Sequence, residues 1–254
     1  MLLAIDVGNT NTEFALFDGD VLRRTWRLRT ERHRTADEYI IWLYQMFASA
    51  GLSLSDVTAC IIASVVPEAV FPLRQLCKHD LSVPLMLLGE DVVDLGIRTA
   101  TEGEVGVDRL VNAAEAWRRY AMPLVIVDFG TATTFDVVSD AGVYLGGAIA
   151  PGVNLSLEAL QAAASKLPGI RIRKPESVIG RSTVPAMESG IFYGYLGLVD
   201  GINRRIVAEY GQPMKIIATG GLAALYSPHS DMIEETVEDL TIRGLLTIYR
   251  TNCT

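Results

Sequence analysis

One short pattern occurs twice in the chain, at a constant interval. In Leu2–Thr12 an apolar run ends in Asp-x-Gly and continues through small hydroxyl and amide residues, and Leu124–Thr134 repeats this order. The interval between Asp6 and Asp128 is 122 residues (128 − 6), about half of the 254 residues. Each copy is followed by a second strand-like run and a turn. The repeat predicts a duplication, with two halves that each open with strand, polar hairpin, strand, turn and strand.

The residue types of this hairpin favour a phosphate ligand. Glycine permits a positive φ and lets a ligand approach the backbone closely. Successive backbone N–H groups, helped by Thr and Asn side chains, can then bind phosphate oxygens. An aspartate at the end of a buried strand, such as Asp6 or Asp128, needs a cation beside it. The alternative is two ordinary hairpins whose aspartates cap the turns.

Composition limits the partners of the chain. Half of the residues are hydrophobic and a fifth are charged, so a large core is expected. The net charge of −8 argues against nucleic acid as a partner. An anionic phosphate ligand would therefore need local compensation, from Mg²⁺ or from a few arginines.

Cysteine usage and hydropathy indicate the compartment. Cys60, Cys77 and Cys253 form no CxxC pair and are typical of reduced thiols. Met1 leads directly into a strand-like run without a basic leader, and no run has the length of a membrane span. These features predict a soluble cytoplasmic protein without a membrane partner.

Asp108 is the strongest single candidate for chemistry. It follows Gly106 and Val107 at the start of a helix that is predicted to reach Tyr120. A carboxylate in a first helical turn interacts favourably with the helix dipole, which is sufficient reason for its presence. The functional interpretation is a general base beside an anion-binding Arg109.

One long helix, or two nearly continuous ones, is predicted from Thr183 to about Tyr210. Its four glycines, spaced 4, 3 and 4 residues apart, form one stripe: Gly190, Gly194, Gly197 and Gly201. Glycine costs about 1 kcal/mol relative to alanine in a helix, so close packing has to compensate. The stripe predicts the close approach of another helix, within the fold or across a dimer.

A glycine pair follows a predicted strand at Met214–Ala218. Gly220 and Gly221 stand where a nucleotide often lies against a strand end, although a helix cap is an equal alternative. The sequence contains no P-loop motif, no Rossmann fingerprint, no nucleophile elbow and no metal-ligand spacing of histidines. A P-loop NTPase, a hydrolase triad and a zinc enzyme are therefore excluded.

Together these motifs resemble those of a known family. The two Asp-Gly-Thr hairpins with Thr219-Gly220-Gly221 are similar to the actin/hexokinase/Hsp70 superfamily. Four segments, in the same order, resemble type III pantothenate kinase: Asp6–Thr12, Gly106–Arg109, Asp128–Thr133 and Gly147–Gly152. The segment from Ser182 to Gly190 also fits this family.

The resemblance implies a fold and an activity. The fold would be α/β, with duplicated actin-like (ribonuclease H-like) lobes whose mixed sheets are flanked by helices. The lobes would span residues 1–118 and 119–254, the second containing a long helix at a homodimer interface. The activity would be ATP-dependent phosphorylation of pantothenate to 4′-phosphopantothenate, the first step of coenzyme A biosynthesis.

The resemblance also implies roles for individual residues. Asp108 would be the general base, and Asp6 would hold Mg²⁺. Asp128 would bind a monovalent cation, K⁺ or NH₄⁺. The residues implied to bind pantothenate are Gly106, Val107, Asp108, Arg109 and Thr183. The residues expected to bind ATP are Asp6, Val7, Gly8, Asn9, Thr10, Asn11, Thr12, Glu13, Thr131, Gly220 and Gly221. Gly220 and Gly221 are included because they stand at a strand end.

One segment departs from the family pattern. Arg98–Glu102 stands where the family commonly has a tyrosine and an Asn-Pro pair, and Ser182 replaces a more familiar Asn. This departure leaves room for a regulatory homologue that binds ligand without turnover. A phosphohydrolase of the same superfamily, which would activate water instead of a substrate hydroxyl, is the other alternative.

Overall fold

The fold consists of two units built on the same sheet topology. The computed structural model describes residues 1–91, 93–164 and 167–253. The first unit comprises residues 1–97, 103–115 and 240–254, and the second comprises 98–102 and 116–239. The division falls within helix α3, close to the lobe boundary expected at residue 118. The C-terminal helix belongs to the first unit, whereas the sequence placed it in the second lobe.

The first unit has a five-stranded sheet in the order β3-β2-β1-β4-β5. Strands β1 and β2 are antiparallel, as are β2 and β3, whereas β4 runs parallel to β1 and β5 runs parallel to β4. The elements of this unit are β1 (Leu2–Val7), β2 (Asn11–Asp18), β3 (Val21–Arg29), α1 (Ala36–Ser49), η1 (Leu54–Asp56), β4 (Ala59–Ser64), α2 (Pro67–Gln75), η2 (Leu76–Asp80), β5 (Leu85–Leu87), the first part of α3 (Val107–Tyr120) and α7 (Leu240–Cys253).

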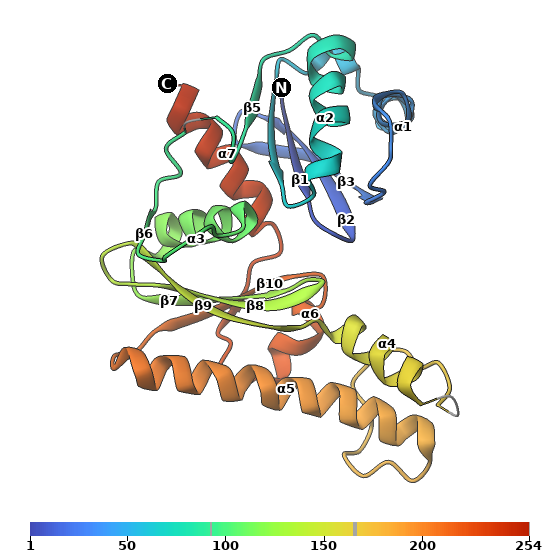
Figure 1. Ribbon diagram of the computed structural model, residues 1–254, viewed down its shortest axis with the longest axis vertical. Helices are drawn as coiled ribbons and strands as arrows, with labels where there is room; N and C mark the ends of the chain where they lie inside the picture. The colour runs from blue at the N-terminus through green and yellow to red at the C-terminus, as the bar shows by residue number, and fades with distance from the viewer. Residues whose placement is uncertain (92, 165–166, 254) are drawn as a thin grey trace. The chain divides into compact units, whose positions relative to one another are not determined.

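The second unit repeats this order and adds one edge strand. Its sheet runs β11-β10-β7-β8-β9-β6, so β7 to β11 correspond in pairing to β1 to β5 (Figure 1). Its elements are β6 (Arg98–Thr99), β7 (Leu124–Phe129), β8 (Ala132–Val138), β9 (Val143–Pro151), α4 (Val153–Ala163), α5 (Thr183–Tyr210), β10 (Lys215–Gly220), α6 (Ala223–Tyr226), η3 (Ser227–His229) and β11 (Glu235–Thr236). The equal strand order confirms the duplication that the repeated motif predicts.

The two hairpins of the repeat pair in registers that differ by one residue. Val7 ends β1 and Asn11 begins β2, which leaves residues 8–10 as the loop. Phe129 ends β7 and Ala132 begins β8, which leaves only 130–131. Asp6 therefore lies opposite Glu13, whereas Asp128 lies opposite Thr134. The constant sequence interval does not give equal loops.

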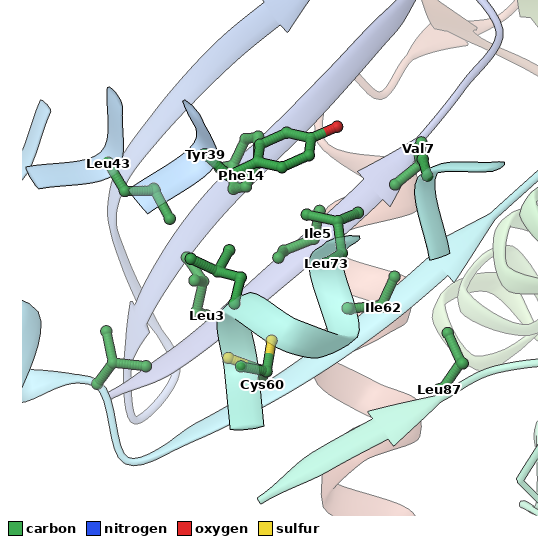
Figure 2. Close-up of a cluster of buried hydrophobic side chains, with 14 of the residues drawn as sticks. Leu3, Ile5, Val7, Phe14, Tyr39, Leu43, Cys60, Ile62, Leu73 and Leu87 are labelled. Carbon is green, nitrogen blue, oxygen red and sulfur yellow. The ribbon is translucent and has the colours of Figure 1, made fainter. Parts of the chain in front are cut away.

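Alternation along the strands divides the first unit into two hydrophobic layers. On one face, Leu3, Ile5 and Val7 of β1 pack with residues of β2, α1 and α2 (Figure 2). On the other face, Leu2 and Ala4 pack with residues of α3 and α7. Because alternate residues of a strand share a face, Asp6 belongs to the α3 and α7 side of the sheet.

Helix α1 begins with a capping box. Thr35 is the N-cap, its hydroxyl accepts from the Glu38 N–H at 3.3 Å, and the Glu38 carboxylate accepts from the Thr35 N–H at 2.7 Å. This capping box satisfies two N–H groups that lack helical partners. The helix buries Tyr39, Leu43 and Phe47 against the sheet.

A short strand lies in the segment that departs from the family pattern. Arg98 and Thr99 form strand β6, which pairs in parallel with β9. Arg98 also donates to the Ala141 carbonyl at 3.0 Å. The part that departs from the family pattern is therefore an edge strand of the second unit.

The crossing of α7 over α3 depends on a glycine. A Cβ added at Gly244 would lie 2.6 Å from Val111 Cγ1 and 2.8 Å from the Val111 carbonyl oxygen. Thr241 and Thr247 lie on either side of this contact in α7. Their hydroxyls donate to Asn112 Oδ1 and Glu115 Oε2 of α3, each at 2.7 Å. The glycine thus allows the two helices to approach closely enough for both hydrogen bonds.

Gly244→Ala is expected to destabilise the protein. Overpacking typically costs 1–3 kcal/mol, and the gain in helix propensity offsets about 1 kcal/mol of it. We expect a net loss of up to about 2 kcal/mol in urea unfolding. Gly169→Ala, where nothing lies within 4 Å of an added Cβ, is the control and should change stability by less than about 0.5 kcal/mol. Equal unfolding midpoints for the two variants would contradict this account of the crossing.

Candidate active site

The first hairpin presents a backbone loop bounded by carboxylates. Asp6 and Glu13 lie directly opposite each other on β1 and β2. Like charges at such positions repel, so a cation is needed near them. Arg27 on β3 supplies one for Glu13, to which it donates at 3.1 Å. Asp6 is half-buried at the end of β1, beside a loop whose backbone N–H groups can receive an anion.

Tight hydrogen bonding defines the conformation of this loop. The Gly8 N–H donates to the Asn11 carbonyl at 3.0 Å. Thr12 is fully buried, and its hydroxyl lies 2.9 Å from the hydroxyl of Thr30, which follows β3. Asn9, Thr10 and Asn11 are exposed at the tip of the loop. Asn9, Thr10 and Asn11 are thus accessible to phosphate, whereas Val7 and Thr12, which were also expected to bind ATP, are fully buried and support the loop.

Asp108 lies in the first turn of α3. Its Oδ1 accepts a hydrogen bond from the Arg109 backbone N–H at 2.8 Å. Burial raises the pKa of Asp108 above its ordinary value, and the N–H and the guanidinium of Arg109 oppose this shift without cancelling it. A carboxylate with a raised pKa accepts a proton more strongly, which suits a general base.

Gly106 leaves no room for a side chain at this helix start. A Cβ there would lie 2.6 Å from Asp108 Oδ1. The Gly106 carbonyl accepts from the Arg109 and Leu110 N–H groups at 3.1 and 3.3 Å, which starts the helix. Val107 packs against the hydrophobic layer shared with α7. The residues before and after Asp108, from Gly106 to Arg109, thus fix the position of its carboxylate.

In the second unit, three of the expected residues gather at one end of the sheet. Strands β7 and β10 are parallel, and Asp128 pairs with Thr219 near their carboxyl ends. Gly220 has a φ of +89°, and a Cβ there would lie 2.4 Å from Asp128 Oδ1. Thr131, in the following loop, accepts from the Gly152 N–H at 3.1 Å. Gly220, Asp128 and Thr131 therefore line one edge of the second sheet.

Thr183 and Gly221 are also accessible. Thr183 is the first residue of α5 and is exposed, and Gly221 follows β10 with open space at its Cβ position. Three of the four glycines in the stripe of the same helix have open space beside them: among the described residues, nothing lies within 4 Å of a Cβ added at Gly190, Gly194 or Gly197. Packing within the chain therefore does not account for these three glycines.

Two polar features of the structure were not predicted from the sequence. One is Thr30, which joins the first hairpin. The other is Asp136, a fully buried carboxylate of β8 that accepts from the Tyr144 hydroxyl at 2.8 Å and from the Thr134 hydroxyl at 2.9 Å. The alternation of β8 places Thr134 and Asp136 on one face, which is the only sequence signal that links them.

The described residues contain neither a ready-made metal cluster nor a membrane span. No three His, Cys, Asp or Glu side chains gather as a metal site in residues 1–91, 93–164 and 167–253. Mg²⁺ in phosphate-transferring enzymes is often held by one or two carboxylates and by the substrate phosphates, which Asp6 and the hairpin loop fit. In the same ranges, no helix combines the length and the apolar character needed to cross a bilayer.

Comparison with known proteins gives the same family along almost the whole chain. The sequence model described as Type III pantothenate kinase matches residues 2–205. A type III pantothenate kinase of Rhodospirillum rubrum is 56% identical over 254 residues, covering 99% of each chain.

Solved structures of lower identity share the fold. A candidate Baf family transcriptional activator of Campylobacter jejuni superimposes with a TM-score of 0.62 at 18% identity, covering 98% of this chain and 97% of that one. A candidate 2-dehydro-3-deoxygalactonokinase of Sinorhizobium meliloti gives a TM-score of 0.58 at 12% identity, covering 98% of each. The duplicated actin-like α/β fold expected from the sequence is thus confirmed, and the chain belongs to the type III pantothenate kinase family.

Proposed function

We propose that this protein phosphorylates the primary hydroxyl of pantothenate with ATP, giving 4′-phosphopantothenate in the first step of coenzyme A biosynthesis. The observation that carries the proposal lies within the first unit. Asp6 belongs to the same face of the sheet as the layer formed with α3 and α7, and the first turn of α3 carries Asp108. A phosphate-binding loop and a half-buried base therefore belong to one layer of the first unit.

Asp108 takes the proton of the pantothenate hydroxyl as that oxygen attacks the γ-phosphorus. The bond from the γ-phosphorus to the β,γ-bridging oxygen breaks, and ADP leaves with that oxygen. The raised pKa of Asp108 favours this transfer. Arg109, with Gly106, Val107 and Thr183, binds the acceptor substrate.

Neutralisation of charge supplies most of the remaining catalysis in phosphoryl transfer. The hairpin residues from Asp6 to Glu13 hold the ATP phosphates, and Asp6 would hold Mg²⁺, which neutralises the developing charge when bound. Gly220, Gly221 and Thr131 line the nucleotide site of the second unit. Asp128, beside Gly220 at the carboxyl end of β7, would hold a monovalent cation, K⁺ or NH₄⁺.

A homodimer accounts for the glycine stripe of α5. Three exposed glycines on one face allow close approach of a second helix, and no helix of the described chain uses them. In a dimer, Thr183 at the start of α5 would lie near the partner subunit. We expect a solution mass of twice the chain mass of 27.6 kDa by light scattering. We also propose a cytoplasmic location, where coenzyme A synthesis has its substrates.

The cation assignment predicts a dependence on K⁺ that Asp128 controls. ADP release with MgATP and pantothenate should be at least roughly tenfold faster in K⁺ than in Na⁺, because the smaller Na⁺ keeps its hydration shell more tightly. Asp128→Asn should abolish most of this difference. A wild-type rate that is equal in the two salts would contradict the cation site. ADP release that ignores pantothenate would instead indicate a phosphohydrolase.

A further inference from the structure

Thr30 is a polar residue of the first unit to which the proposed mechanism assigns no role. It follows the last residue of β3, at the end of an arginine-rich edge strand. Its hydroxyl donates to the Gly8 carbonyl at 2.7 Å and lies 2.9 Å from the Thr12 hydroxyl. Its backbone N–H donates to the Thr10 carbonyl at 2.9 Å. One residue thus contacts the beginning, the tip and the end of the phosphate hairpin.

These contacts determine the direction of the peptide groups in the hairpin. The peptide bond is planar and trans, so the C=O of one residue and the N–H of the next point in opposite directions. Because the Gly8 carbonyl points toward the Thr30 hydroxyl, the Asn9 N–H points away from it. By the same argument, the Asn11 N–H points away from the Thr30 amide. Two of the N–H groups that could face a phosphate are thus oriented by one threonine.

The Thr30 hydroxyl has no equivalent replacement in the hairpin. Thr12 is fully buried, and its hydroxyl would lose a hydrogen-bond partner if the Thr30 hydroxyl were removed. A buried polar group without a partner destabilises its surroundings, and the Gly8 carbonyl would lose its bond as well. The loop could then adopt other conformations, in which its N–H groups no longer converge.

We infer that Thr30 is a positioning residue for the phosphates of ATP: it fixes the Gly8–Thr12 loop in the conformation that receives them. This inference rests on the proposed function, because it assigns Thr30 to the same nucleotide site. Thr30 acts through the hairpin backbone and makes no contact with the acceptor substrate. Its loss should therefore weaken nucleotide binding and leave pantothenate binding unchanged.

Thr30→Val tests this role, because it keeps the shape of the side chain and removes the hydroxyl. We expect the KM for MgATP and the Kd for MgADP by calorimetry to rise roughly tenfold, which corresponds to about 1.4 kcal/mol. The KM for pantothenate should stay within about twofold. Thr30→Ser, which keeps the hydroxyl, should restore binding. Thr25→Val on the exposed part of β3 is the matched control and should bind MgADP like the wild type.

The outcomes separate the inference from the function on which it rests. If Thr30→Val binds MgADP like the wild type, or if Thr30→Ser loses as much affinity as Thr30→Val, the positioning role is wrong and the kinase assignment is untouched. If the KM for pantothenate rises as much as that for MgATP, the effect is a general loss of structure and the inference fails. If the wild type itself binds no MgADP, the nucleotide site and the inference fall together.

Discussion

Asp108→Asn should lower turnover by roughly 10²- to 10⁴-fold, the usual contribution of a general base. Asparagine has nearly the same shape but does not accept the hydroxyl proton. The KM values for MgATP and pantothenate should change little, because the amide can still occupy the first turn of α3. Steady-state kinetics at saturating substrates would measure the loss. A variant with near wild-type turnover would show that another group takes the proton.

The same variant should be at least as stable as the wild type at neutral pH. Burial raises the pKa of Asp108 in the folded protein. A raised carboxyl pKa stabilises the fold fully only below the unfolded-state value, about 3.9, and this stabilisation is lost as the pH rises through the folded-state pKa. Above the folded-state pKa, the wild type therefore carries the cost of a partly buried charge that asparagine lacks. Thermal midpoints at pH 7 and pH 4 should show an advantage of the variant that shrinks on acidification.

Gly220→Ala should impair both the stability and the activity of the second unit. Its φ of +89° is strained for alanine, and the added Cβ would lie 2.4 Å from Asp128 Oδ1 and 2.7 Å from the Phe129 nitrogen. The strained φ alone costs about 1–2 kcal/mol, and overpacking typically adds 1–3 kcal/mol. Because the clash displaces the Asp128 carboxylate, activation by K⁺ should be lost as well. Urea unfolding and K⁺ titration of turnover measure the two effects.

Gly221→Ala provides a matched control for the stability effect. Gly221 adjoins Gly220 and its φ lies outside the left-handed region, and an added Cβ would meet nothing within 4 Å. Its unfolding free energy should differ from that of the wild type by less than about 0.5 kcal/mol. If the two alanine variants unfold at the same urea concentration, the close approach of Gly220 to Asp128 does not contribute to the free energy of unfolding.

Local patterns in the sequence predicted the repeated elements well. The apolar run before Asp6, the turn after it and the second copy at Asp128 all follow from residue periodicity, and the strand order confirms that they form equivalent hairpins. The long helix α5 was equally predictable, because its signals depend on neighbours within a few residues.

Features that depend on contacts between distant residues were not predictable. The one-residue difference between the hairpin loops is invisible because the interval of 122 residues is conserved through both hairpins. The two residues of β6 are too few to show a period. In the sequence, nothing distinguishes Thr30 from other hydroxyl residues at the end of a charged strand. Its contacts with the hairpin become visible only in the structure. The packing of α7 on α3 likewise joins segments that are far apart in sequence.

The most direct test of the central assignment is to measure both products of one reaction. With the wild-type protein, MgATP, K⁺ and pantothenate, we expect 4′-phosphopantothenate, detected by mass spectrometry, to form in a one-to-one ratio with ADP. Without pantothenate, ADP should form at a negligible rate. ADP production that continues without pantothenate, or nucleotide binding without either product, would contradict the assignment of this chain as an ATP-dependent pantothenate kinase.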